Sequence, residues 1–459
     1  MKDVFLFLLT LIFAVRSLPQ KMPPINWQLM DWKQDGYHGM SVEKAYNELL
    51  KDKKPLKKIV IAVMDCGVDT AHPDLAGIWW TNKKEIPGNG IDDDRNGFVD
   101  DVHGWNFGGN STHGTMESVR EYVRLRSRYE SLKDTTALVE DEGYRYWKKV
   151  LTQKEKERSE LVENSKAVIE HNDPAYWRKK ELGDDPYKKD NMPYGNNNIY
   201  IKTPGEFHAT GIIGVICALR NNGIGGNGIT NAVEIMPIVH TWGDEEWDKD
   251  IAIGIRYAVD NGAQVINMSF GKYLSPQKEW VIDAMKYAEQ YGVLIVAAAG
   301  NDFLNIDSNT LYPFAYSNDN IISNLIKVGA STSDSTLVAS FSCYGKKTVD
   351  VFAPGVHVYT TLPNGKYFMV DGTSTSAPMV AGLAAFIWSY YPSFNYRQIK
   401  YCIEKSAEPI NDLVKKPGSN ERIPFNSLSR TGGIVNAFNA IKIAEQIEQG
   451  KIVINESNY

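Results

Sequence analysis

Short hydrophobic runs alternate with longer amphipathic segments along much of the chain. The first is a β-branched run at 59–64. Similar runs follow at 234–239, 265–268 and 293–297, with helix-like stretches such as 278–291 between them. This rhythm predicts βαβ units whose parallel strands are buried on both faces. The expected fold class is therefore α/β, a doubly wound and mainly parallel sheet with helices on both faces.

The same rhythm continues towards the C-terminus. The segments 325–330, 338–342 and 349–354 continue it and predict further strands. Residues 371–388 contain a glycine and several hydroxyls near their start and continue as an almost wholly apolar run, which predicts a buried helix. Two further helices are expected after it.

The N-terminal region has the pattern of a targeting segment followed by a short extension. Lys2 precedes an apolar run at 4–15, which is too short to span a bilayer but suits the core of a signal peptide. We expect residues 1–17 to be a signal peptide, residues 18–58 an extension packed on the body, and residues 59–459 one large domain. The protein would then be exported, to a periplasm or out of the cell, with no membrane span after signal removal.

The segment at about 114–200 differs in character from the rest of the chain. It is rich in Glu, Lys, Arg and Tyr, and its apolar positions recur at helical spacing, as at Val119, Tyr122 and Val123. This pattern predicts two or three surface helices inserted into the domain.

Composition excludes some classes of protein. With 43% hydrophobic residues, 23% charged residues and a formal charge of −6, the chain is an ordinary globular protein with no reason to bind nucleic acid. A monomer is expected. The four cysteines are few and widely spaced, so buried thiols are expected rather than a disulfide framework. They are Cys66, Cys217, Cys343 and Cys402.

No cofactor is expected for the chemistry. The glycine-rich stretch at 223–228 formally satisfies the spacing of a dinucleotide-binding loop. However, it follows a predicted helix and precedes a predicted strand, whereas a phosphate-binding loop needs the opposite order.

An acidic loop at 88–101 has the spacing of a calcium-binding EF-hand loop. Five positions carry the oxygen ligands and the turn glycine that such a loop requires. They are Asp92, Asp94, Asn96, Gly97 and Asp100. Position twelve is His103 instead of a glutamate, so Asp101 or a remote residue would complete the site. Structural Ca²⁺ is expected here, and the alternative is a solvated acidic turn.

Ser374 stands at the mouth of the predicted buried helix. Pro378 is tolerated only in the first helical turn, so Ser374 should lie where backbone N–H groups are unpaired. Such donors favour an anion, and acyl transfer to a serine needs donors for the oxyanion. Gly372 would let a substrate approach closely. On this segment alone, a serine that only caps the helix is an equal alternative.

Four earlier stretches, taken in order with the serine segment, resemble those of the subtilisin-like serine peptidases. They are Ile59–Leu75, His208–Gly214, Val265–Gly271 and Val296–Asn301. The resemblance implies a secreted serine endopeptidase that cleaves proteins or peptides through an acyl-enzyme intermediate. Asp65, His208 and Ser374 would form the catalytic triad, and the Asn301 amide would donate to the oxyanion.

The resemblance also implies how a substrate is bound. An extended peptide would pair with the backbone of Ser269, Phe270 and Gly271. The walls of the primary pocket would be Ala298, Ala299 and Gly300. These small residues suggest a roomy apolar pocket that prefers large apolar side chains, while the far wall of the pocket is not identified.

Two histidines open triplets similar to the family's histidine motif. His113 is followed by a charged amphipathic segment expected on the surface, whereas His208 is followed by the apolar residues of a buried helix. A general base must be held rigidly, so His208 is expected to be the catalytic one. Ala209, Gly211 and Thr375 depart from the family's motifs, which leaves a catalytically silent peptide-binding protein as the alternative.

Overall fold

The computed structural model describes nine stretches of the chain. They are residues 22–111, 113–132, 138–155, 162–189, 193–201, 207–240, 245–314, 316–317 and 320–454. The expected signal peptide at 1–17 lies outside the described residues.

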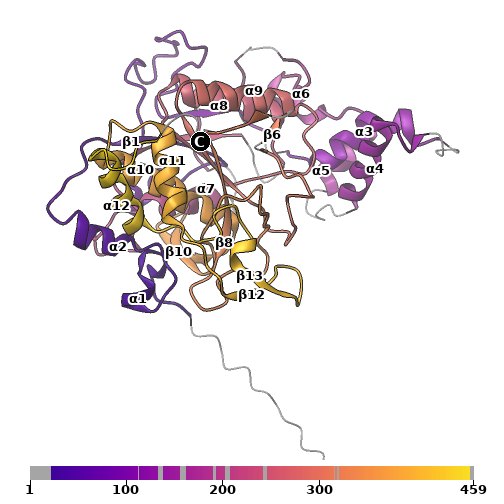
Figure 1. The fold of residues 1–459 in the computed structure, drawn as a ribbon. Coiled ribbons are helices and arrows are strands. Elements are labelled where there is room, and N and C mark those ends of the chain that lie inside the picture. The colour runs from indigo at the N-terminus through magenta and orange to yellow at the C-terminus, as the bar shows by residue number, and fades with distance from the viewer. Residues whose placement is uncertain are drawn as a thin grey trace, which may run out of the picture.

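A seven-stranded sheet forms the centre of the body (Figure 1). The strands are β1 (Ile59–Asp65), β2 (Trp105–Asn106), β3 (Val233–Val239), β4 (Val265–Met268), β5 (Leu294–Ala298), β8 (Leu325–Ser331) and β9 (Val351–Pro354). They lie in the order β2-β3-β1-β4-β5-β8-β9, and every neighbouring pair is parallel. The first strand in the sequence, β1, is therefore an interior strand of the sheet, and later strands lie on both sides of it.

Helices cover both faces of this sheet. They are α7 (His208–Cys217), α8 (Asp248–Asp260), α9 (Lys278–Gln290), α10 (Thr373–Tyr390), α11 (Tyr396–Ser406) and α12 (Ala437–Glu448). Side chains alternate along β1, so Ile61 and Val63 join the core shared with α7 and α10. Ala62 and Met64 point the other way and join the core shared with α8 and α9. The doubly wound α/β fold predicted from the apolar runs is confirmed.

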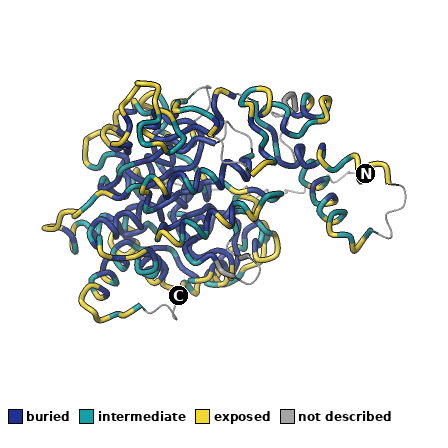
Figure 2. The backbone as a smooth tube through the Cα atoms, turned by 90° about the horizontal axis from the view of Figure 1, so that it is seen from above, coloured by how far each residue is buried: buried dark blue, intermediate teal, exposed yellow. Residues whose placement is uncertain are grey.

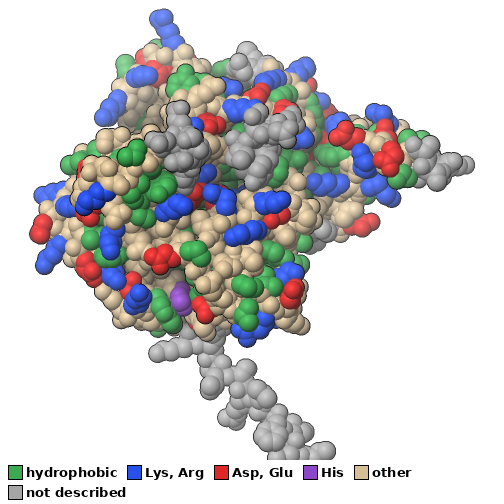
Figure 3. Space-filling view, in the orientation of Figure 1, with side chains coloured by type: hydrophobic (Ala, Val, Ile, Leu, Met, Phe, Trp, Pro, Cys, Tyr) green, Lys and Arg blue, Asp and Glu red, His purple; other side chains and the backbone are tan. Residues whose placement is uncertain are grey.

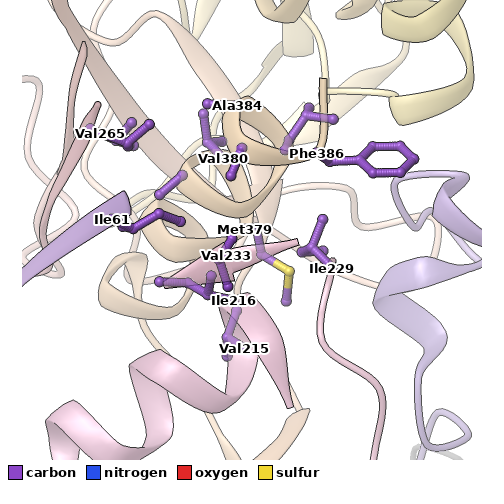
Figure 4. Close-up of a cluster of buried hydrophobic side chains, with 14 of the residues drawn as sticks. Ile61, Val215, Ile216, Ile229, Val233, Val265, Met379, Val380, Ala384 and Phe386 are labelled. Carbon is purple, nitrogen blue, oxygen red and sulfur yellow. The ribbon is translucent and has the colours of Figure 1, made fainter. Parts of the chain in front are cut away.

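Helix α10 runs through the larger of these two cores. Every residue of the helix except Ser374 and Tyr390 is buried, and the helix packs against β1, β4, β5, β8 and β9. Figure 4 shows Val380 and Ala384 of this helix in one cluster with Ile61 of the sheet. Each fully buried valine or isoleucine side chain contributes about 1.5–3 kcal/mol. The position of α10 is therefore strongly determined by packing.

The N-terminal segment packs into the same core. Its short helices are η1 (Trp27–Leu29), α1 (Trp32–Asp35), α2 (Val42–Lys44) and η2 (Ala45–Leu49). Trp27 and Met40 are fully buried, and the indole Nε1 of Trp27 donates to His357 O at 2.9 Å. The segment also contacts the other end of the chain, because Ala437 N donates to Met40 O at 2.7 Å. The N-terminal segment and α12 therefore close the core together.

Four helices, rather than two or three, make up the described part of the insertion. They are α3 (Glu117–Tyr129), α4 (Glu142–Lys154), α5 (Val162–Glu170) and α6 (Tyr176–Leu182). In Figure 1, α3, α4 and α5 extend away from the body on one side.

The charged residues at the start of α3 are buried, which corrects the expectation of a solvated surface segment. Arg120 and Glu117 are 0% and 1% exposed and pair at 3.0 Å, and Lys272 Nζ lies 2.9 Å from Glu117. Arg120 also donates to the backbone oxygens of Thr115 and Glu245. Buried charges are tolerated when they are paired and hydrogen-bonded. Paired charges, and not only apolar contacts, thus join the insertion to the body.

The prediction of a strand at 338–342 is wrong. In this segment only Val338 makes an isolated bridge, to Ser331. The Asp334 carboxylate accepts from Thr336 N at 2.9 Å and turns the chain before a longer ladder can form. The sequence patterns also missed short antiparallel hairpins. They are β6 (Tyr316–Ser317) with β7 (Asn320–Ile321), β10 (Val358–Leu362) with β11 (Lys366–Val370), and β12 (Leu413–Lys415) with β13 (Arg422–Pro424).

The distribution of residues between interior and surface is that of a globular body. All four cysteines are buried thiols outside any disulfide, as predicted. Figure 2 shows the buried backbone concentrated inside the body and the exposed residues at its rim. On the face shown in Figure 3, lysine and arginine are interspersed with aspartate and glutamate. Within the described residues, no helix is both long and apolar enough to cross a membrane.

Replacing Trp27 by alanine should destabilise the fold. The change empties a fully buried site and removes the donor to His357 O, so the free energy of unfolding should fall by about 3–5 kcal/mol. Trp32→Ala is the matched control, because Trp32 is 49% exposed and stacks on His38. This control substitution should lower the free energy of unfolding by less than about 1.5 kcal/mol. Urea unfolding measures both, and equal losses would contradict a core role for Trp27.

Candidate active site

Four predicted catalytic residues come from four elements to the carboxyl edge of the sheet. Asp65 is the last residue of β1, and Asn301 follows shortly after β5. His208 is the first residue of α7, and Ser374 is the second residue of α10. Catalytic and ligand-binding groups of open α/β sheets collect at this edge.

Asp65 and His208 form a pair that runs from the interior to the surface. The Asp65 side chain is 4% exposed, while that of His208 is 42% exposed. His208 Nδ1 lies 2.8 Å from Asp65 Oδ2 and 3.0 Å from Oδ1. Cys66 N also donates to Asp65 Oδ1, at 2.8 Å. With Nδ1 engaged by the carboxylate, Nε2 is the imidazole nitrogen available for proton transfer.

This pairing shifts the pKa of both groups. Burial alone would raise the pKa of Asp65, but the charge of His208 and its hydrogen bond outweigh that effect and hold the pKa below its ordinary value of 3.8. Burial lowers the pKa of His208, yet the charge and hydrogen bond of Asp65 outweigh burial and raise it above 6.5. The imidazole is therefore a stronger base than a free histidine.

Ser374 is partly accessible at the amino end of α10, between neighbours that are buried. Gly372 caps the helix with a φ of 150°, and a Cβ on this residue would lie only 2.8 Å from Ser374 Oγ. A larger residue would displace the hydroxyl, so glycine is required here. Pro378 is the sixth residue of the helix, so the prediction that it lies in the first turn is wrong.

The position of Pro378 has a direct effect on Ser374. In a regular helix the N–H of residue 378 would donate to Ser374 O, but proline has no N–H. Ser269 Oγ supplies the missing donor and lies 2.8 Å from Ser374 O. Asn267 Nδ2 in turn donates to Ser269 Oγ at 3.0 Å. The start of α10 is thereby tied to the end of β4.

Asn301 is oriented by the first residue of α10. Thr373 N and Thr373 Oγ1 both donate to Asn301 Oδ1 at 2.9 Å. The Thr373 hydroxyl also accepts from Gly300 N at 3.0 Å. With Oδ1 engaged in this way, Asn301 Nδ2 lies 3.7 Å from the position of a Cβ on Gly372, beside Ser374. An amide donor at this place can meet negative charge that develops on a nearby oxygen.

A cleft of about 570 Å³ contains Ser374 and reaches the insertion. Its walls include most of the predicted substrate-binding residues and the oxyanion amide, namely Ser269, Phe270, Gly271, Ala298, Gly300 and Asn301. Ala299 does not line the cleft and is fully buried in the cluster behind it. Met116, Ser118 and Gln153 of the insertion line the same cleft, although nothing in the sequence pattern pointed to them.

A second pocket of about 480 Å³ contains both His208 and Ser374. The imidazole and the serine therefore face one space. Its remaining walls are mostly apolar and come from α7 and the β10–β11 hairpin, with Ile212 and Phe368 among them. Because the hairpin was not predicted, this wall was missed as well.

His113 lies in the insertion and is engaged there. Its Nδ1 lies 2.7 Å from Glu181 Oε1, and its ring stacks on Trp177 with the centroids 3.9 Å apart. It lines neither of the two pockets that contain Ser374.

The acidic loop gathers two of its predicted ligands together with one residue that was not predicted. Glu85, Asp92 and Asp94 each offer a carboxylate oxygen, and these oxygens lie within 4.8 Å of one another. Gly97 N donates to Asp92 at 2.8 Å, which closes the turn expected of such a loop.

The other predicted ligands of this loop make hydrogen bonds within the protein. The Asp100 carboxylate accepts from the backbone N–H groups of residues 88–90. Asp101 accepts from Tyr257 Oη at 2.7 Å and from Asn96 Nδ2 at 3.0 Å. Burial raises the pKa of Asp101 to about 6, although these hydrogen bonds act in the opposite direction.

The chain is similar in sequence to known peptidases. The model of the Subtilase family matches residues 56–426. Subtilisin DY of Bacillus licheniformis is 35% identical over 213 residues, which are 46% of this chain and 73% of that protein. Subtilisin J of Geobacillus stearothermophilus is 37% identical over 207 residues, 44% of this chain and 51% of that protein.

A further relative and a solved structure extend the comparison. The thermophilic serine proteinase of Bacillus sp. (strain AK1) is 37% identical over 235 residues, 51% of this chain and 52% of that protein. A solved protease structure from Pseudoalteromonas arctica PAMC 21717 aligns with a TM-score of 0.52 over 92% of this chain and 98% of that chain. Its sequence identity is 19%, so this likeness bears on the fold alone.

The role of Ser269 at the helix start can be tested by a compensating pair of substitutions. Ser269→Ala leaves Ser374 O without a donor and should lower the free energy of unfolding by about 1–3 kcal/mol. Adding Pro378→Ala returns an N–H to the helix and should recover roughly 1 kcal/mol of that loss. Urea unfolding of both single variants and the double variant measures the coupling. If the changes in unfolding free energy of the two single variants simply add up in the double variant, Ser269 does not replace the donor that Pro378 lacks.

Proposed function

Because the chain belongs to the Subtilase family and is a serine endopeptidase, we propose that it cleaves peptide bonds through Ser374, His208 and Asp65. The observation that carries this proposal is the 2.8 Å contact between His208 Nδ1 and the buried Asp65 carboxylate, in a pocket that His208 shares with Ser374. Proteins or peptides are the substrates, and an acyl-enzyme is the intermediate.

In the first half of the reaction, Ser374 Oγ attacks the carbonyl carbon of the scissile peptide bond. His208 Nε2 takes the hydroxyl proton and then gives it to the leaving amine, so that the C–N bond breaks and the acyl group stays on the serine. Asp65 holds the Nδ1–H tautomer and stabilises the imidazolium. Water then attacks the ester with the same proton transfers and restores the free serine.

The tetrahedral intermediates carry negative charge on the former carbonyl oxygen. The Asn301 side-chain amide and the backbone N–H of Ser374 are the donors proposed for it. The two bonds from Thr373 to Asn301 Oδ1 support this role, because they turn Nδ2 towards the serine before any substrate arrives. Donors that need no reorganisation during the reaction stabilise the transition state most effectively.

The remaining parts of the proposal concern binding and location. A substrate would lie extended along the backbone of residues 269–271, so that main-chain hydrogen bonds provide affinity for many sequences. We propose that the protein is exported, since Lys2 and the apolar run at 4–15 have the form of a signal peptide. The chemistry assigned to the triad uses only side chains of the protein.

Labelling with a fluorophosphonate probe, together with casein hydrolysis, tests the mechanism. Wild-type protein should be labelled at Ser374, and Ser374→Ala should be neither labelled nor active. His208→Ala removes the general base and should lower both rates by more than about 10⁴-fold. His113→Ala is the matched control and should keep both rates within about twofold of wild type, because His113 is engaged by Glu181 away from the serine.

Three results would contradict parts of this proposal. If Ser374→Ala is as active as the wild-type protein, Ser374 is not the nucleophile. Loss of activity in His113→Ala, with His208→Ala unaffected, would reassign the base. Wild-type protein that binds peptides but is neither labelled nor active would favour the catalytically silent alternative.

We also propose that the acidic loop holds a structural calcium ion. Three carboxylates lie within 4.8 Å of one another, and such a group of like charges is stabilised by a cation. Carboxylate oxygens are the ligands that Ca²⁺ prefers. Glu85, Asp92 and Asp94 are the proposed ligands, and Asn96 lies in the same loop. The ion would take no part in the hydrolysis.

Chelation should lower the melting temperature, and excess Ca²⁺ should restore it by binding the folded state. The double substitution Asp92→Asn with Asp94→Asn removes two charges from the cluster and should abolish this dependence. Asp93→Asn is the matched control, because Asp93 accepts from Ile86 N and lies outside the cluster. Thermal unfolding with and without chelator provides the measurement. If the melting temperature of the wild-type protein is the same with and without chelator, the loop binds no structural calcium and is a solvated acidic turn.

A further inference from the structure

The side chain of Leu311 lies between the two walls of the primary pocket. A Cβ on Gly271 would lie 3.1 Å from Leu311 Cδ2, and a Cβ on Gly300 would lie 2.8 Å from the same methyl carbon. Leu311 is 3% exposed and lines the cleft that contains Ser374 and Asn301. One methyl group thus occupies the space between the two backbone walls into which a substrate side chain would enter.

The backbone around Leu311 is held from two sides. Tyr312 N donates to Lys272 O at 2.9 Å, and Lys272 N donates to Tyr312 O at 3.0 Å. Lys327 Nζ donates to Leu311 O at 2.9 Å and to Pro313 O at 2.6 Å, and the Lys327 residue is 2% exposed. Moving this segment would break several buried hydrogen bonds at once, and each buried group left unpaired is costly. Leu311 is therefore a fixed part of the wall.

The space behind Leu311 is filled. Cys343 and Ile306 belong to the same buried cluster and are 0% and 3% exposed. The Cys343 Sγ would itself lie 3.2 Å from a Cβ on Gly300. Protein interiors are close-packed, so a leucine displaced towards these residues would overpack the cluster.

We propose that Leu311 determines the specificity of the primary pocket and restricts the residue on the acyl side of the cleaved bond to small side chains such as alanine. This inference rests on the proposed function and deepens it. The small walls at Ala298 and Gly300 alone would admit a large apolar group, and Leu311 fills that room instead. A phenyl ring would have to displace Leu311 against a packed core, which is unfavourable.

A series of tetrapeptide p-nitroanilides that differ only at the residue before the anilide tests this inference. Wild type should cleave the alanine substrate with a kcat/KM at least roughly tenfold above that of the phenylalanine substrate. Leu311→Ala should raise the phenylalanine-to-alanine ratio by at least roughly tenfold. Leu304→Ala is the matched control, because Leu304 lines the same cleft but is not among the nearest groups to either glycine. Its ratio should stay within about twofold of wild type.

The amount of active enzyme is counted by fluorophosphonate labelling of Ser374, so partial unfolding of a variant does not change the ratio. Leu311→Val is a milder second variant and should shift the ratio in the same direction. Labelled wild type that prefers phenylalanine, or a labelled Leu311 variant with an unchanged ratio, overturns this inference alone. Wild type that is not labelled at Ser374 overturns the proposed function and this inference with it.

Discussion

The enclosed first turn of α10 is the constraint on which the candidate active site depends. The helix is packed against five strands, so the backbone groups at its start need partners from the protein. Pro378 removes one donor, and Ser269 replaces it from the end of β4. Thr373 uses its N–H and its hydroxyl to hold Asn301. The bonds that satisfy the helix end are thus the same bonds that set Ser374 beside an amide donor, which makes the site preorganised.

Elements with a clear hydrophobic period were predictable, whereas elements defined by tertiary pairing were not. The run at 59–64 is apolar on both faces, which suits an interior parallel strand. The run at 338–342 mixes apolar residues with two serines, and the turn at Asp334 prevents a ladder. The β10–β11 hairpin was missed because Thr360 and Thr361 are polar, and both are buried by donating to backbone oxygens of α7. Side chain to backbone bonds of this kind leave no period in the sequence.

Part of the candidate site was likewise predictable from the sequence and part was not. The order of several motifs pointed to the proposed catalytic residues, but a single residue brought in by a loop has no such context. Leu311 reaches the pocket because the distant Lys327 holds its carbonyl oxygen, and Glu85 reaches the acidic cluster from outside the recognised loop. The insertion was misjudged for another reason: a run of charges was taken as a solvated face, but Arg120 and Glu117 are paired and buried. Charge predicts exposure only where no partner is supplied from elsewhere in the fold.

The contact between the N-terminal segment and α12 can form only late in synthesis. Met40 O accepts from Ala437 N, and Trp27 shares its core with α12, so these contacts span nearly the whole sequence. They cannot form before the last helix has left the ribosome, and contacts of such high order are associated with slow folding. Until then the apolar side chains that this segment buries, Trp27 and Met40 among them, lack part of their partner surface. The core that fixes α10 is therefore closed late, by residues from opposite halves of the sequence.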